Sequence, residues 1–363
     1  MEEHTSTAGD ANRPAKAYEQ MEGEQKLDND EIALYDRQIR LWGMAAQARM
    51  RNTRVLLVNF GALGGEVAKN LVLSGIGSLT ILDNRVAAAE DLGSQFLLAE
   101  EDLGRLRAEV GAARLRDMNP RVSLAVDARN VTEQPAEYFA GHDLVVATDC
   151  SRADLEKINA ACRARGVPFY AGGLHGLWGY VFVDLVQFDS TEEKAVTVDA
   201  PITALGSVSE RREVVSVRRE HEEDPRSARE IVTTRNYYRP FSEVLAQGTL
   251  AGRLTPRQLR RLLPALPLTL AAFLHGHGND DVASFEAEVK KMCHQLGSSP
   301  SNVPAECTEL FLRQIGVELP PVAAVIGGAM AQDIINTMGK RQSPLNNFVV
   351  LDGITLDMQI FEL

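Results

Sequence analysis

The sequence predicts an α/β protein built on a doubly wound, mostly parallel sheet with helices on both faces. Three consecutive features of one stretch carry this prediction. An apolar run, RVLLV from Arg54, is typical of a buried strand, and a glycine-rich turn leads from it into an amphipathic helix that stops near Gly75. A second apolar run, SLTIL from Ser78, ends on Asp83. Strand, glycine turn, helix, strand and acid form the signature of a Rossmann-like βαβ unit.

Helix and strand patterns continue to alternate after this unit, which favours one extended sheet. In order, we expect a helix over 105–118, strands over 121–129 and 142–148, a helix over 151–166, a strand pair over 167–185 and, near the C-terminus, a small-residue helix followed by two strands.

Three other regions complete the expected organisation. Residues 1–30 are polar and should form a disordered tail. Residues 31–363 should form one domain with a helical and irregular insertion over about 189–309, where strand pieces and short helices are separated by charge runs and prolines. A helix should run from Glu31 to Asn52. Its expected apolar face consists of Leu34, Ile39, Leu41, Trp42 and Met50.

Composition excludes several classes of function. Lys and Arg total 38 against 50 for Asp and Glu, a net charge of −12 without a segregated basic patch, so we expect no nucleic-acid partner. No apolar run reaches the roughly 18 residues of a membrane span, so we expect no membrane partner. Four cysteines without a C-x-x-C pair indicate a reducing compartment and predict no zinc site.

The glycine turn departs from the dinucleotide-binding pattern G-x-G-x-x-G. Asn59 occupies the first glycine position, whereas Gly61 and Gly64 occupy the second and third. Asp83 lies where a ribose-binding acid is expected, about 20 residues further along. The turn alone leaves two interpretations open: it binds a nucleotide at the start of the helix, or its glycines only allow the helix to pack closely on the strand.

Longer strings resemble the ThiF-type superfamily of ubiquitin-like-protein activating enzymes. The resemblance rests on YDRQIRLWG from Tyr35, SQFLLAEEDLGRLRAE from Ser94 and PPVAAVIGGAMAQDIINTMGKRQSPLNNFVVLDG from Pro320, and it covers about residues 31–353. It is greatest to the smaller, non-catalytic subunits of the heterodimers that activate SUMO. It implies that residues 31–363 form a pseudo-adenylation domain.

The resemblance also implies that the nucleotide site is degenerate. Where catalytic members carry the motif NRQF, this chain has Gly93 and Ser94 in place of Asn and Arg. Arg107 replaces the phosphate-binding lysine, and Arg85 replaces a second acid near the ribose. Loss of several groups that offset phosphate charge should abolish adenylation. We therefore expect the partner subunit to bind ATP and Mg²⁺, and this chain to bind neither.

One motif retains a role in catalysis by this resemblance. In the superfamily, the first arginine of R-Q-I-R contacts the phosphates in the other subunit's site, so Arg37 should act in trans. A salt bridge between Arg37 and Asp36, or another nearby acid, is the alternative.

The other reactive side chains are expected to have structural roles. These are the four cysteines, Cys150, Cys162, Cys293 and Cys307, and the histidine of GGLHGLWG, His175. Asp149 lies near the family's metal-binding position, although the alignment can shift by one residue to Cys150.

The resemblance implies a heterodimer in which a catalytic partner adenylates SUMO and accepts it on a cysteine. It also implies residence in the nucleus, and in the cytoplasm as well. The same subunit for another ubiquitin-like modifier is the nearest alternative. An autonomous ThiF-type adenylating enzyme and a dinucleotide-dependent oxidoreductase are less compatible with the sequence, because the NRQF arginine is missing and no acid/base group for hydride chemistry is evident.

Overall fold

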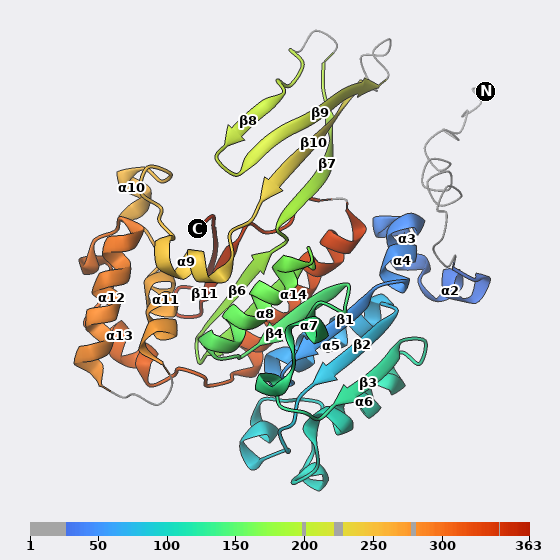
Figure 1. Ribbon diagram of the computed structural model, residues 1–363, viewed down its shortest axis with the longest axis horizontal. Helices are drawn as coiled ribbons and strands as arrows, with labels where there is room; N and C mark the ends of the chain where they lie inside the picture. The colour runs from blue at the N-terminus through green and yellow to red at the C-terminus, as the bar shows by residue number, and fades with distance from the viewer. Residues whose placement is uncertain (1–26, 198–200, 221–227, 277–280, 341) are drawn as a thin grey trace, which may run out of the picture.

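The computed structural model describes residues 27–197, 201–220, 228–276, 281–340 and 342–363. Within them, a large sheet flanked by helices is joined to a smaller sheet that extends away from it (Figure 1). Most of the expected tail, residues 1–30, lies outside the described residues.

The large sheet combines parallel and antiparallel strands. Its strands are β1 (Arg54–Val58), β2 (Ser78–Leu82), β3 (Ser123–Asp127), β4 (Leu144–Thr148), β5 (Phe169–His175), β6 (Trp178–Asp184), β11 (Phe348–Asp352) and β12 (Asp357–Phe361). They lie in the order β12-β11-β6-β5-β4-β1-β2-β3, and the strands from β5 to β3 pair in parallel. Strands β6, β11 and β12 pair antiparallel. Because the chain runs outward from β1 to β3 and then returns to β4 on the other side of β1, the sheet is doubly wound, as predicted.

Helices cover both faces of this sheet (Figure 1). The helices of the described residues are α2 (Asn29–Leu34), α3 (Asp36–Trp42), α4 (Met44–Arg51), α5 (Ala62–Ser74), α6 (Arg107–Met118), α7 (Ala136–Phe139), α8 (Arg152–Ala164), α9 (Phe241–Gln247), α10 (Pro256–Leu259), α11 (Ala265–His275), α12 (Val282–Leu296), α13 (Ala305–Leu312) and α14 (Pro320–Gly339). Short 3₁₀ turns are η1 (Ala89–Gly93), η2 (Glu100–Asp102), η3 (Val131–Glu133) and η4 (Pro300–Asn302).

Strand β1 shows why the sequence needs helices on both faces. Successive side chains of a strand point to opposite faces. Val55 and Leu57 pack in the core beneath α5, α6 and α14, whereas Leu56 and Val58 pack in the core beneath α8 and the helices of the insertion. An uninterrupted apolar run is therefore buried throughout, as expected for a parallel strand in the centre of a sheet.

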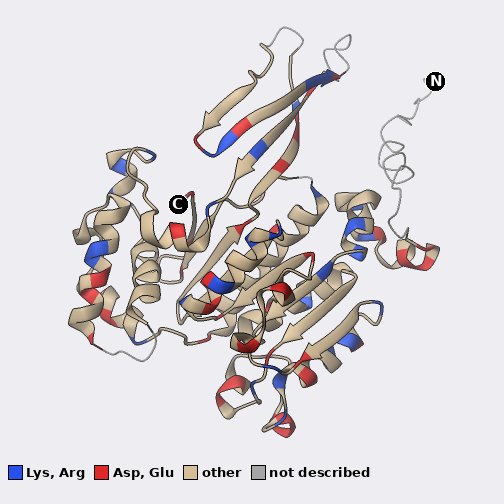
Figure 2. Ribbon diagram, in the orientation of Figure 1, with Lys and Arg blue, Asp and Glu red and all other residues tan. Residues whose placement is uncertain are grey.

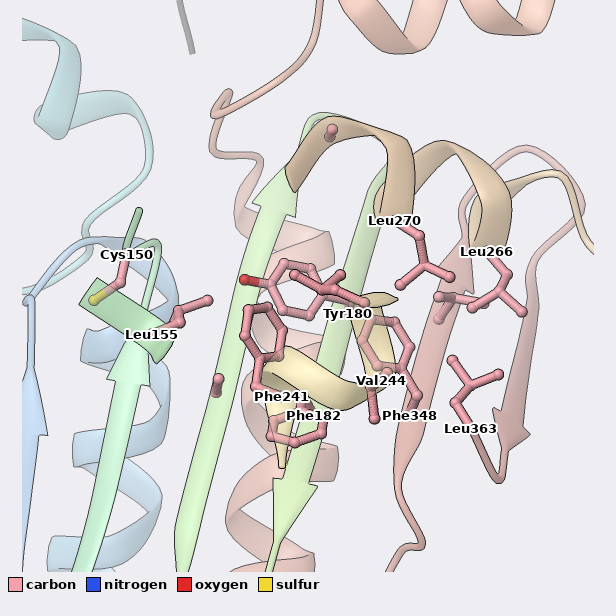
Figure 3. Close-up of a cluster of buried hydrophobic side chains, with 14 of the residues drawn as sticks. Cys150, Leu155, Tyr180, Phe182, Phe241, Val244, Leu266, Leu270, Phe348 and Leu363 are labelled. Atoms are coloured by element: carbon pink, nitrogen blue, oxygen red, sulfur yellow. The ribbon is translucent and has the colours of Figure 1, made fainter. Parts of the chain in front are cut away.

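The insertion differs from the strand pieces that the sequence suggested. Its strands β7 (Gln187–Ala195), β8 (Gly206–Ser209), β9 (Arg212–Glu220) and β10 (Arg229–Tyr237) form one antiparallel sheet in the order β7-β10-β9-β8. The pairing of β7 with β10 joins residues more than thirty positions apart, and such a contact leaves no local pattern in the sequence. After this sheet, α9 packs Phe241 against Phe182 and near Phe348 of the large sheet (Figure 3).

The single helix predicted for residues 31–52 is wrong. The chain forms three short helices, α2, α3 and α4, because the backbone turns at Tyr35 and at Gly43, whose φ of 87° few other residues adopt. Leu34 and Leu41 are 55% and 72% exposed, so they do not join one buried apolar face. The interruption gives α3 a direction of its own.

The surface agrees with the mixed charge of the sequence. Acidic and basic side chains are interspersed, for example along α12 (Figure 2). Among the described residues, no helix combines the length and the apolar character that crossing a membrane requires.

Candidate functional site

The turn after β1 has the geometry of a nucleotide-binding turn, with an asparagine in the first glycine position. Asn59 adopts φ of 65°, a left-handed conformation that asparagine tolerates better than most residues. Its side-chain amide donates to the carbonyl oxygen of Thr148 at 2.9 Å, which ties the end of β1 to the end of β4. A Cβ atom at Gly64 would lie 2.6 Å from the carbonyl oxygen of Asn59, so the third glycine is needed for close packing of the helix on the strand.

A carboxylate from a distant part of the chain occupies the start of α5. The backbone N–H of Ala62 donates to Glu318 Oε1 at 3.0 Å, and the Ser94 hydroxyl donates to Oε2 at 2.9 Å. A side chain at Gly61 would overlap this carboxylate. The N-terminus of a helix is the place where such folds bind phosphate. Here an internal anion fills that place, and Ser94, at the position of the missing arginine, helps to hold it.

The acid at the end of β2 is also satisfied internally. Asp83 Oδ2 accepts from the backbone N–H of Phe60 and from Arg107 Nε, both at 2.7 Å, while Oδ1 accepts from the backbone N–H of Arg85 at 2.8 Å. Arg107 Nη1 also donates to Asp91, at 3.2 Å. Asp83 and Arg107 are 2% and 3% exposed. The predicted ribose acid and the arginine that replaces the lysine thus form a buried ion pair.

Asp149 directly follows β4 and lines a pocket together with Arg107 and Glu318. Its Oδ1 accepts from the backbone N–H of Leu174 at 2.9 Å. Burial, and then the negative charge of Glu318, raise the pKa of Asp149 to about 7. Within the described residues, no group of three or more His, Cys, Asp or Glu side chains is arranged to hold a metal ion.

The cysteines lack the properties of a catalytic thiol. Cys150, Cys162 and Cys293 are buried, and burial raises the pKa of each thiol. Cys307 is half-buried, and burial raises its pKa to about 11. A thiolate nucleophile requires the opposite shift. His175 lies at the end of β5, where its Nδ1 accepts from the backbone N–H of Gly316 at 3.2 Å.

Arg37 lies on α3, on a different part of the surface. It is exposed, and within the described residues it makes no ion pair. Asp36 pairs instead with Arg40, one turn further along, at 3.0 Å. The alternative assignment of Arg37, a salt bridge with Asp36, is therefore not observed.

The buried side chain of Tyr35 anchors the start of α3. Its ring packs against Gly75 at the end of α5, and its hydroxyl accepts from the Asn119 side-chain amide at 2.9 Å. At the other end of α3, the Trp42 indole donates to Gln47 Oε1 at 2.9 Å. These contacts hold the backbone of α3 against the body while Arg37 points away from it.

Sequence reasoning found most of this site but missed one residue. Asn59, Gly61, Gly64 and Asp83 come together at the carboxyl edge of the sheet, and Arg107 joins them. Glu318 was missed because it lies about 250 residues after the turn. Its only local signal is an acid two residues before the helix that starts at Pro320.

A doubly wound α/β sheet whose first strand leads through a glycine turn into a helix defines the class of Rossmann-like nucleotide-binding folds. Comparison with known proteins shows that the chain belongs to the ThiF family, whose model matches residues 35–363. The resemblance and the Rossmann-like fold predicted from the sequence are thereby confirmed.

Three relatives are similar over most of their length. The chain is 47% identical to the DNA damage tolerance protein RHC31 of Saccharomyces cerevisiae, over 93% of this chain and 98% of that protein. It is 34% identical to the SUMO-activating enzyme subunit 1 of Rattus norvegicus, over 90% and 93% of the two chains, and 33% identical to that of Homo sapiens, over 90% and 94%.

Proposed function

We propose that this chain is the non-catalytic subunit of a SUMO-activating heterodimer. The catalytic partner binds ATP and Mg²⁺, adenylates the C-terminal glycine of SUMO and accepts it on a cysteine. The similarity to SUMO-activating enzyme subunit 1 over nine-tenths of the chain supports this assignment. The internal carboxylate at the start of α5 supports the placement of ATP in the partner.

The observation that carries the proposed contribution of this chain is the exposure of Arg37 on an anchored helix. An arginine that stabilises phosphate charge in another subunit must be free of internal partners and held on a rigid element. Arg37 meets both conditions within the described residues. Its guanidinium would offset the charge that develops on the phosphates of the partner's ATP.

The surface around α3 supports a role in subunit pairing. Leu41 is 72% exposed beside Arg37 on the same helix. A nearby hollow of about 280 Å³ is lined by side chains of α3, α5 and α14, among them Trp42, Leu73 and Ile335. Exposed apolar side chains next to such a hollow are typical of a protein-binding surface.

The test is ATP–pyrophosphate exchange by the reconstituted heterodimer with SUMO. Arg37→Ala should slow exchange by about 100-fold or more, since removal of one such charge-stabilising donor costs about that much. Size-exclusion chromatography should show the heterodimer intact. Arg40→Ala, on the same exposed helix, is the matched control and should exchange at nearly the native rate.

Unchanged exchange by Arg37→Ala would refute the role in trans. Robust exchange by this chain alone with SUMO would refute the assignment of ATP to the partner. Exchange that depends on a different ubiquitin-like protein would assign the chain to another modifier. We also propose residence mainly in the nucleus, with some in the cytoplasm, which imaging of the tagged full chain tests.

A further inference from the structure

The degenerate site retains a cavity that the proposed function does not use. Its volume is about 740 Å³, within the range of roughly 300–1,000 Å³ typical of small-molecule sites. It lies at the carboxyl ends of the parallel strands, next to the point between β1 and β4 where the strand order reverses. Ligands of open α/β sheets bind at this place.

The cavity has one apolar side. Leu174, Tyr180, Ala272 and Phe273 line it, and they come from β5, β6 and α11. Tyr180 and Phe273 lie edge to face with their ring centroids 5.1 Å apart. Such a wall can accept the flat face of a heteroaromatic ring.

The cavity is also lined by polar groups whose hydrogen bonds are incomplete. Arg107 is 3% exposed, and its Nη2 has no hydrogen-bond partner within the described residues, although Nε and Nη1 are paired. Asp149 Oδ2 also lacks a partner there. Arg107 Nη2 requires a hydrogen-bond acceptor, and Asp149 Oδ2 can accept from a donor. A ligand with both kinds of group would satisfy them after small side-chain movements.

Charge decides which ligands fit. The N–H of Ala62 and the Ser94 hydroxyl, which could hold a phosphate, both donate to Glu318. The charged side chains of the lining are four acids against three arginines, so the charge at the phosphate position itself comes from Glu318; the seven are Glu90, Asp91, Asp149, Glu318, Arg85, Arg107 and Arg152. A polyphosphate would have to displace Glu318 from the start of α5, whereas an uncharged ligand would leave the Glu318 contacts intact.

We propose that this cavity binds an uncharged ligand of the nucleoside class, and that Glu318 excludes the corresponding polyphosphate. The ring packs on the apolar side, the polar groups of the ligand meet Arg107 and Asp149, and the phosphate position stays closed. The preference of an ATP site for phosphate is thereby reversed. This ligand is distinct from the ATP of the reaction.

Isothermal titration calorimetry on the full chain without its partner and without Mg²⁺ tests this, with adenosine and ATP as the probes. Adenosine should bind, and ATP should bind about tenfold more weakly or worse, a difference of about 1.4 kcal/mol. Glu318→Gln keeps the shape and an acceptor for Ala62 but removes the charge, so it should narrow that ratio by about tenfold. Glu90→Gln removes a charge from the same cavity away from α5 and should leave the ratio nearly unchanged.

The comparison of the two probes on the native chain needs no variant, so it holds even if Glu318→Gln unfolds. No binding of adenosine at millimolar concentration, or binding of ATP as tight as that of adenosine, would overturn the proposal. Equal effects of Glu318→Gln and Glu90→Gln would overturn the role of Glu318. None of these outcomes bears on exchange by the heterodimer, so the proposed function is tested separately.

Discussion

Two arginines of this chain stand in opposite environments. Arg107 is buried near the turn after β1 and paired with Asp83 and Asp91. Arg37 is exposed on α3 and has no ion pair within the described residues. A catalytic arginine must be available to its substrate, and only the second one is. The difference agrees with the proposed function, in which Arg107 stabilises the chain itself and Arg37 is the arginine offered to the partner's substrate.

The same contrast holds for the anionic groups. Glu318 accepts hydrogen bonds from a backbone amide and from Ser94. Asp83 accepts from a backbone amide and from Arg107. An active phosphate site keeps its donors free until the substrate arrives. In this chain a carboxylate fills those donors and forms a structural contact between α5 and the segment before α14.

Removal of Arg107 should have the largest effect on stability. Arg107→Ala leaves Asp91 without the cation it pairs with, and leaves buried Asp83 with only the half-exposed Arg85, 3.7 Å away. Breaking a buried pair in this way typically costs about 3–5 kcal/mol. Urea unfolding of the full chain measures the change. Arg105→Ala removes a side chain that is 62% exposed, and its partner Asp102 keeps an ion pair with Arg114 at 2.7 Å, so this variant should unfold at nearly the native urea concentration. Equal stability of both variants would mean that Arg107 is not a structural cation.

A buried acid without a cation should show the next largest effect. Asp333 of α14 accepts from the Tyr170 hydroxyl and from the backbone N–H of Leu345, and burial raises its pKa from 3.8 to about 6. The Asp333 carboxyl therefore binds its proton more tightly in the folded state than in the unfolded state. The associated stability is present below pH 4 and is lost as the pH rises through 6, by about 3 kcal/mol at most.

Asp333→Asn should remove this part of the pH dependence, so its stability relative to the native chain should rise between pH 4 and 6.5. Asp127→Asn is the control of opposite sign. The hydrogen bond from Arg129 lowers the pKa of Asp127 to about 2, so its stabilisation is present above pH 4 and is lost as the pH falls through 2. If the difference in stability between the native chain and Asp333→Asn did not change between pH 4 and 6.5, the raised pKa of Asp333 would be contradicted.

These residues also show what a sequence can predict. The unit β1, α5 and β2 was predictable because apolar periodicity, glycine positions and a terminal acid follow one another along the chain. Asn59 was predictable for the same reason, since its place in the turn requires a left-handed backbone. Local sequence order determines each of these features.

Contacts between distant segments were not predictable in this way. Glu318 contacts the start of α5 although it lies 256 positions after Ala62 along the chain. Strand β7 pairs with β10, and the hairpin of β8 and β9 lies between them in the sequence. The break at Gly43 was missed because its neighbours continue a helical pattern, while the packing of Tyr35 on Gly75 redirects the chain. The recognition of Glu318 as an internal anion therefore required the structure.

The turn after β1 should show a smaller effect. Asn59→Ala loses the amide contact with Thr148 and places Cβ in a left-handed conformation, whereas Asn59→Gly loses only the contact. The alanine variant should thus be less stable than the glycine variant by about 1–2 kcal/mol, the usual cost of that conformation for a residue other than glycine. Thermal unfolding of the two variants measures the difference. An alanine variant as stable as the glycine variant would indicate that the turn relaxes.

The smallest effect on the chain itself is expected on α3, where the contrast with Arg107 is sharpest. Leu41→Ser changes a side chain that is 72% exposed, so the free energy of unfolding should stay within about 0.5 kcal/mol of the native value. Pairing with the catalytic partner should nevertheless weaken, because an apolar group beside Arg37 is lost from the proposed interface. Unfolding of the isolated chain and titration of the heterodimer separate the two effects. A loss of stability without a loss of pairing would mean that α3, like the old nucleotide site, serves the fold of this chain and not its partner.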